Sequence, residues 1–129
     1  MKGKARQVLL LDDEEAILVP TARYFRNQGC RVDVASEPGE AEALVDGRCY
    51  DLALLDLQVT RFGGYEGLEV LRRIRRRGHA TRVIVLSAYL SAEVAAEARE
   101  LGADSVLPKP QPLPKLAHLG FALMGTPRE

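Results

Sequence analysis

The stretch Val8-Leu9-Leu10-Leu11-Asp12-Asp13-Glu14-Glu15 changes from four apolar residues to four acidic residues without a break. A short, continuous apolar run is typical of a strand that is covered on both faces of a parallel sheet. The acidic residues follow at the point where such a strand would end. The stretch therefore predicts a buried strand whose carboxyl end carries negative charge.

Four more strands are expected along the chain. Continuous apolar runs predict strands at residues 52–55, 83–86 and, more weakly, 106–107. The run Val32-Asp33-Val34-Ala35 alternates apolar with polar residues, which predicts a strand at a sheet edge, half open to water. Helical patterns separate the strands at about residues 14–28, 38–46, 67–77, 91–101 and 113–123. This alternation, with right-handed crossovers, favours a doubly wound α/β fold: a flavodoxin-like (βα)5 unit with a parallel sheet of order 2-1-3-4-5 and helices on both faces.

Proline and glycine modify two of the helical patterns. Pro20 falls inside the first pattern, where a missing N–H costs about 3 kcal/mol, so we expect a kink or a late start. Pro112 and Pro114 should delay the last helix, although Pro114 is tolerated in a first turn. Gly102 is expected to cap the fourth helix at its C-terminus.

Length and composition limit the possible functions. With 129 residues the chain suits one domain, expected at residues 1–125, with 126–129 as a tail or the start of a linker. Its 18 basic and 18 acidic residues cancel, so direct nucleic-acid binding is not expected. No apolar stretch is long enough for a membrane span, and the beginning of the chain does not resemble a signal peptide, so we expect a cytoplasmic protein. Cys30 and Cys49 are interpreted as reduced packing residues.

Reactive side chains follow four of the predicted strands. Asp12 and Asp13 follow the first, Asp56 the third, Ser87 the fourth and Lys109 the fifth. Because parallel strands end at the same edge of the sheet, all five should meet where the strand order reverses. The sequence therefore predicts one polar site there.

The expected chemistry follows from the charges at this site. Three carboxylates within about 4–6 Å of one another repel by several kcal/mol, so the site needs a cation. Oxygen ligands without His or Cys favour Mg²⁺. With the metal and Lys109 offsetting the charge of a phosphoryl group, Asp56 can act as a nucleophile, and the hydroxyl of Ser87 can donate to a phosphoryl oxygen.

Simpler interpretations exist for single residues. Asp13 alone could be the N-cap of the first helix. Arg72, Arg73, Arg75, Arg76 and Arg77 are interpreted mainly as a solvated face at the end of the third helix, with an acidic partner as the alternative.

Taken together, the motifs resemble the receiver domains of two-component response regulators, such as the chemotaxis regulator, over essentially the whole chain. The first part of the resemblance lies in Leu10-Leu11-Asp12-Asp13-Glu14-Glu15, Leu54-Leu55-Asp56-Leu57 and the helix at residues 67–75. The second part lies in Val85-Leu86-Ser87-Ala88-Tyr89, Leu101-Gly102-Ala103-Asp104 and Leu107-Pro108-Lys109-Pro110.

This resemblance implies a phosphoacceptor switch, not an enzyme acting on other substrates. It implies that Asp56 accepts the phosphoryl group from a histidine kinase, a phosphotransfer protein or a small phosphodonor. It further implies that Asp12, Asp13, Asp56 and the backbone carbonyl of Gln58 hold Mg²⁺, that Ser87 senses the phosphoryl group, and that Lys109 bridges it to the acidic residues. A cis bond between Lys109 and Pro110 is also implied. The expected partner face is the fourth helix, fifth strand and fifth helix, used for an unknown downstream protein, an effector domain or a homodimer.

Three features depart from the family pattern. The loop at residues 59–66 is about three residues longer than usual and lacks a proline, and its adjacent glycines suggest a lid that orders on phosphorylation or partner contact. Val106 stands where the family commonly has a Tyr or Phe, so signalling would use Tyr89 or a small backbone shift, unless Val106 is simply a core residue. Gln58 and Tyr89 occupy positions that tune hydrolysis in this family, and the bulky phenol predicts slow dephosphorylation.

Two alternative functions stay open at this point. A receiver-like docking module would keep the acidic site but signal without phosphorylation. A haloacid-dehalogenase-type phosphatase would also use an aspartyl phosphate and Mg²⁺, but it needs a second Asp where this chain has Gln58. A flavodoxin-like nucleotide binder is disfavoured, because acidic residues replace its phosphate loop after the first strand.

Overall fold

The computed structural model describes residues 5–58, 64–78, 80–126 and 128. It contains five strands: β1 (Gln7–Leu11), β2 (Arg31–Ala35), β3 (Leu52–Asp56), β4 (Arg82–Ser87) and β5 (Ser105–Pro108). The helices are α1 (Glu15–Asn27), α2 (Pro38–Gly47), α3 (Gly67–Arg77), α4 (Ala92–Glu100) and α5 (Leu113–Met124). Every predicted element is present, within two residues of its expected bounds.

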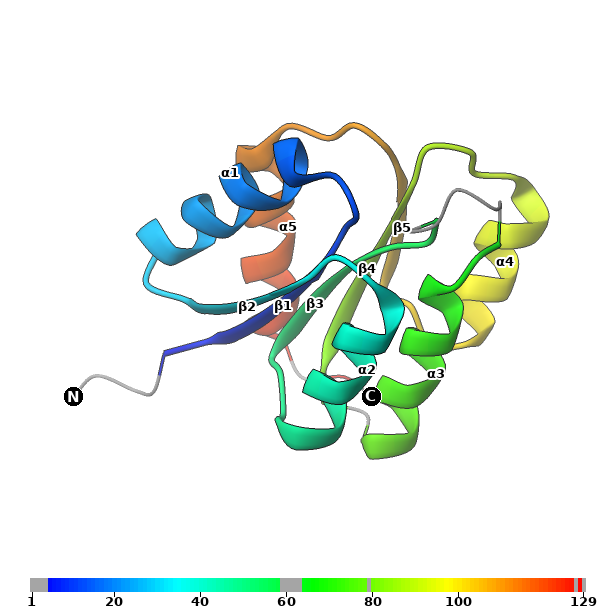
Figure 1. Cartoon of the computed structure of the whole chain (residues 1–129), viewed down its shortest axis with the longest axis horizontal. Coiled ribbons are helices and arrows are strands. Elements are labelled where there is room, and N and C mark those ends of the chain that lie inside the picture. Colours follow the sequence, from blue (N-terminus) through cyan, green and yellow to red (C-terminus); the bar gives the residue numbers. More distant parts are fainter. Residues whose placement is uncertain (1–4, 59–63, 79, 127, 129) are drawn as a thin grey trace.

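The strands form one parallel sheet of order β2-β1-β3-β4-β5, as predicted (Figure 1). β1 lies between β2 and β3, with Leu11 opposite both Ala35 and Leu55. This register places the carboxyl ends of β1 and β3 side by side. The residues that follow those two strands are therefore neighbours in space.

Helices cover both faces of the sheet (Figure 1), and an apolar cluster lies under each layer of helices. Along β1, Val8 and Leu10 face one layer with α1 and α5, while Leu9 and Leu11 face the other with α2, α3 and α4. All four of these side chains are buried. Alternate residues of a strand point to opposite faces, so a continuous apolar run is what a sheet covered on both faces requires.

The outer strand β2 is exposed on part of one face. Val32 is buried, but Val34 is 40% exposed, as expected for a strand at the edge of the sheet. At the end of α4, Gly102 adopts φ +104°, a conformation that L residues rarely adopt, and its N–H donates to the carbonyl of Arg99. The predicted glycine cap is therefore confirmed.

The prolines differ in their effect. Helix α1 begins at Glu15 and continues through Pro20, so the late start is wrong. Pro20 is exposed, and the helix tolerates the loss of one backbone donor because four of its residues lie on the buried face. Pro114 lies in the first turn of α5, as predicted.

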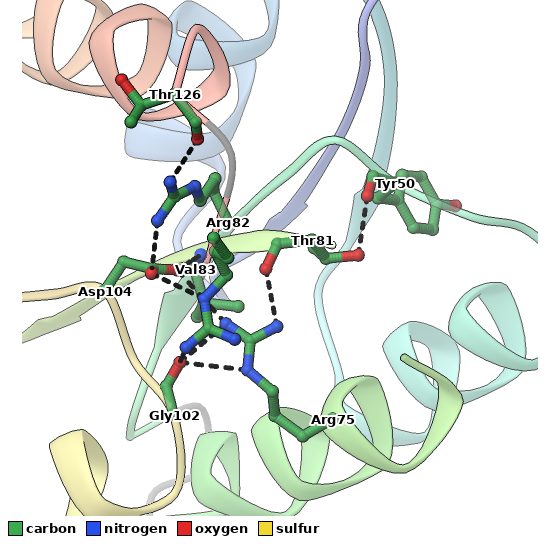
Figure 2. Close-up of polar contacts among 9 residues, drawn as sticks. Tyr50, Arg75, Thr81, Arg82, Val83, Gly102, Asp104 and Thr126 are labelled. Carbon is green, nitrogen blue, oxygen red and sulfur yellow. Dashed lines mark hydrogen bonds and ion pairs between the residues drawn. The ribbon is translucent and has the colours of Figure 1, made fainter. Parts of the chain in front are cut away.

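Two interpretations of individual side chains need correction. Cys30 is buried, but Cys49 is exposed, so only Cys30 is a packing residue. The side chain of Arg75 is only 10% exposed and pairs with Asp104, which contradicts a fully solvated arginine face (Figure 2). Sequence spacing missed this pair because its members are 29 residues apart. In the part of the chain that the structure describes, no helix is both long and apolar enough to cross a membrane.

Candidate functional site

The predicted polar residues meet at the carboxyl edge of the sheet. Asp12 directly follows β1, Asp56 is the last residue of β3, and Ser87 is the last residue of β4. All three are buried, with exposed fractions of 6%, 4% and 0%. Lys109 directly follows β5, and its side chain is 9% exposed. Burying this many polar side chains is costly unless they pair with one another.

Lys109 links the two buried aspartates. Its Nζ donates to Asp12 Oδ2 at 2.9 Å and to Asp56 Oδ2 at 3.1 Å. Glu14 lies further out, with its Oε1 3.8 Å from the same Nζ. The Lys109–Pro110 peptide bond is cis, as the resemblance implied.

A ligand atom from each of Asp12, Asp13 and Asp56 lies within 4.8 Å of the other two. Asp13 is exposed, whereas the other two are buried. Asp13 is not the N-cap of α1: that position is Glu14, whose N–H donates to Asp12 Oδ1 at 2.9 Å. The side chain of Asp13 is thus not used to cap the helix.

The pKa values reflect this crowding. Burial raises the pKa of Asp56 to about 6, although Lys109 opposes the shift, and the charge of Asp12 adds to it. Burial alone would lower the pKa of Lys109, but its hydrogen bond to Asp12 and the charge of Asp56 raise it. The ionised form of Asp56 is therefore disfavoured in the folded protein, and a further cation at the site would reduce this free-energy cost.

The donor set fits a hard divalent cation. It consists of carboxylate oxygens, and three carboxylates with one lysine leave an excess of negative charge. Mg²⁺ binds such oxygens while keeping several water ligands. The N–H of Gln58 donates to Asp56 Oδ1 at 3.1 Å, so Gln58 adjoins the cluster. A metal-ligand role for the Gln58 carbonyl stays a prediction.

The backbone joins the fourth and fifth strands to this cluster. The N–H of Leu57 donates to the carbonyl of Leu86, and the N–H of Lys109 donates to the carbonyl of Ser87. The Oγ of Ser87 accepts from the N–H of Tyr89 at 3.3 Å, and Tyr89 is 76% exposed. Ser87 therefore lies beside the acidic cluster and contacts the loop that precedes α4.

Val106 is 7% exposed and belongs to the apolar core, which confirms the simplest interpretation of this residue. The hypothesis of a mobile lid at 59–66 concerns a loop of which 59–63 lie outside the described residues.

Sequence reasoning missed two residues next to the site. A Cβ added to Gly67 would lie 2.5 Å from the carbonyl oxygen of Asp56 and 2.8 Å from Leu57 Cα. A glycine at the start of the helix was the available signal. Tyr65 was missed too: its hydroxyl donates to the carbonyl of Tyr89 at 3.4 Å, across two loops that no sequence pattern connects.

Comparisons with known proteins identify the family to which the chain is similar. The family model of the response regulator receiver domain matches residues 8–119. The alginate biosynthesis transcriptional regulatory protein AlgB of Pseudomonas aeruginosa is 39% identical over 108 residues, which are 83% of this chain and 23% of AlgB. The photosynthetic apparatus regulatory protein RegA of Rhodobacter capsulatus is 33% identical over 108 residues, which are 84% of this chain and 57% of RegA. The chain thus spans about a quarter to somewhat over half the length of these relatives.

Two solved structures have the same fold. A CheY-like response regulator receiver domain from Methanospirillum hungatei superposes with a TM-score of 0.88 at 25% identity, covering 95% of each chain. A response regulator from Burkholderia pseudomallei, with a phosphorylated aspartic acid, a calcium ion and citrate, gives a TM-score of 0.78 at 26% identity, covering 87% of this chain and 64% of the other.

Proposed function

Because the chain belongs to the response regulator receiver family, we propose that Asp56 is its phosphoacceptor and that phosphorylation at this residue changes partner binding. The observation that carries the proposal is the pairing of buried Asp56 and Asp12 with one lysine, beside Asp13 and the buried hydroxyl of Ser87. The related Burkholderia structure, which holds a phosphorylated aspartic acid, supports it.

The proposed step is a phosphoryl transfer to a carboxylate. An oxygen of Asp56 forms a bond to phosphorus as the bond from phosphorus to the donor's leaving atom breaks, and the leaving atom keeps that electron pair. On a histidine kinase or phosphotransfer protein the leaving atom is an imidazole nitrogen, and on acetyl phosphate it is a carboxylate oxygen. The attack requires ionised Asp56, which the adjacent ammonium of Lys109 favours.

We propose that Asp12, Asp13, Asp56 and the Gln58 carbonyl hold Mg²⁺. The metal would supply positive charge for the oxygens of the transferring group. Lys109 already lies between Asp12 and Asp56, so it can move its hydrogen bond from Asp56 Oδ2 to a phosphoryl oxygen while keeping Asp12.

The state of the site would reach the surface through Ser87. Its Oγ now accepts from the N–H of Tyr89, and the same hydroxyl can donate to a phosphoryl oxygen. A movement of Ser87 toward that oxygen would loosen the contact with Tyr89. Since Val106 is buried and has no ring to relocate, the loop that holds Tyr89 is the proposed route.

Partner surfaces follow from the same arrangement. A groove of about 190 Å³ runs between α1 and the start of α5, lined by Ile17, Pro20, Leu113 and Lys109 among others, and it would receive the phosphodonor protein. The face of α4, β5 and α5 is proposed for a downstream partner or a homodimer, since Leu119 and Leu123 of α5 are only partly buried. We propose residues 1–125 as the receiver unit, with 126–129 as a tail or the start of a linker.

Mass spectrometry after incubation with acetyl phosphate and Mg²⁺ tests the proposal. We expect a mass gain of one phosphoryl group that is absent in Asp56→Asn and in samples with EDTA, and present in the control Asp46→Asn, an exposed carboxylate on α2. No gain in the wild type would favour the docking module. Continued turnover of a generic phosphate ester, without stable labelling, would favour the phosphatase.

A further inference from the structure

A second polar cluster surrounds Asp104, whose side chain is 8% exposed. Asp104 Oδ2 accepts from the N–H of Val83 at 2.8 Å and from Arg75 Nη2 at 3.2 Å, and Oδ1 accepts from Arg82 Nη1 at 2.9 Å. Figure 2 shows these groups converging from α3, β4 and the turn between α4 and β5. Asp104 precedes β5, whereas Lys109 follows it, so this cluster lies at the opposite edge of the sheet from Asp56.

The segment after α5 binds to this cluster. Arg128 Nε donates to Asp104 Oδ1 at 2.8 Å, and Arg128 Nη2 donates to the carbonyl of Gly102 at 3.3 Å. The carbonyl of Thr126 accepts from Arg82 Nη2 (Figure 2). Among the described residues, the contacts of this segment thus include a backbone carbonyl, that of Thr126, and a guanidinium, that of Arg128.

The cluster would stay satisfied without Arg128. Asp104 would keep its bonds from Val83, Arg82 and Arg75. Arg75 also donates to the carbonyls of Gly102 and Thr81. Release of Arg128 would therefore leave Asp104 with three remaining donors and not as an unpaired buried carboxylate, which is the most costly outcome of breaking a buried ion pair.

Like charges also weaken the attachment of Arg128. Three guanidinium groups share the single carboxylate of Asp104. Burial lowers the pKa of Arg75 to about 10, and the charge of Arg128 is the next largest cause of this shift. Attraction to Asp104 and repulsion by Arg75 and Arg82 therefore act on Arg128 together.

From this geometry we propose that Thr126 and Arg128 form a latch that docks in cis on Arg82, Gly102 and Asp104 and opens without unfolding the domain. When closed, the latch ties the path of the chain after α5 to the turn between α4 and β5. A displacement of that turn would then redirect the segment that follows α5. The proposal does not depend on phosphorylation of Asp56.

NMR of the arginine side chains tests the latch on the full chain. Hydrogen exchange at Nε of Arg128 should be slower by about tenfold or more than at Arg99, an exposed arginine on α4, because charge-assisted bonds protect the Arg128 N–H. Arg128→Lys keeps the charge but loses the fork that reaches both Asp104 and Gly102. In this variant the amide signals of residues 101–104 should shift, while the urea midpoint and the rate of labelling by acetyl phosphate stay unchanged. Arg99→Lys is the matched control.

Two results would overturn the latch. Equal exchange at Arg128 and Arg99 would mean that Arg128 is not docked in solution. Loss of the fold in Arg128→Lys, seen as a large fall in the urea midpoint, would mean that the contact belongs to the core and cannot open separately. Both the exchange rate and the urea midpoint can be measured whether or not Asp56 becomes phosphorylated.

Discussion

Replacing Asp56 by asparagine should stabilise the metal-free domain. The introduced side-chain amide has the size of the carboxylate but no charge. Its one oxygen can accept from only one of the two donors, the N–H of Gln58 and Lys109 Nζ, which now bond to different oxygens of Asp56. In the native protein, burial raises the pKa of Asp56 from its ordinary value of 3.8 to about 6. At about 1.4 kcal/mol for each pH unit, this shift costs the ionised carboxylate about 3 kcal/mol of folding stability.

The sign of the pH dependence follows from proton binding. Between pH 3.8 and about 6 the folded state holds more protons at Asp56 than the unfolded state does, so this residue makes the protein less stable as the pH rises. The penalty is complete above pH 6. We therefore expect Asp56→Asn to raise the free energy of unfolding at pH 7.5, by at most about 3 kcal/mol because one hydrogen bond is lost, and to raise it less at pH 5.

Urea unfolding in EDTA at both pH values measures this effect. Glu100→Gln, at an exposed position on α4, is the control and should change stability by less than about 0.5 kcal/mol. Adding Mg²⁺ should stabilise the wild type more than Asp56→Asn. A ligand that binds the folded state stabilises it, and the variant lacks the Asp56 carboxylate, one of the proposed metal ligands. If Asp56→Asn is no more stable than the wild type at pH 7.5, or if its advantage does not shrink at pH 5, the cost assigned to burying this carboxylate is wrong.

Three further predictions concern residues around the site and α1. Gly67→Ala should lower the free energy of unfolding by about 1–3 kcal/mol and slow labelling by acetyl phosphate, because the new Cβ would lie 2.5 Å from the Asp56 carbonyl oxygen. Gly39→Ala, whose new Cβ has nothing within 4 Å, should have neither effect. Equal unfolding curves for the two variants would contradict the predicted clash at Gly67. Pro20→Ala should stabilise α1, because it restores a donor inside a helix that is exposed at this position; an unchanged or lower urea midpoint would argue against a cost at Pro20. Tyr89→Ala should lose its phosphoryl group faster than the wild type if the exposed phenol screens it from water, and equal decay rates measured by mass spectrometry would sink that idea.

Much of the fold was predictable because it depends on local patterns. Apolar runs such as Val83–Leu86 predicted strands covered on both faces, and the helical patterns between them predicted the crossovers. The edge position of β2 followed from the alternation at Val32 and Asp33. Parallel strands end at a common edge, so placing Asp12, Asp56, Ser87 and Lys109 together required only that the strands and their order were right.

The sequence by itself thus determined the elements, the strand order and which residues reach the carboxyl edge. Only the tertiary structure decided that Lys109 bonds to both Asp12 and Asp56, that Glu14 is the N-cap of α1, and that Arg75 and Arg128 share Asp104. The periodicity of apolar residues in a sequence predicts contacts only within one helix or strand and the face that it buries. A hydrogen bond between residues tens of positions apart requires the donor and acceptor to be placed to within a few tenths of an ångström. The chain reaches this precision only after the layers have packed.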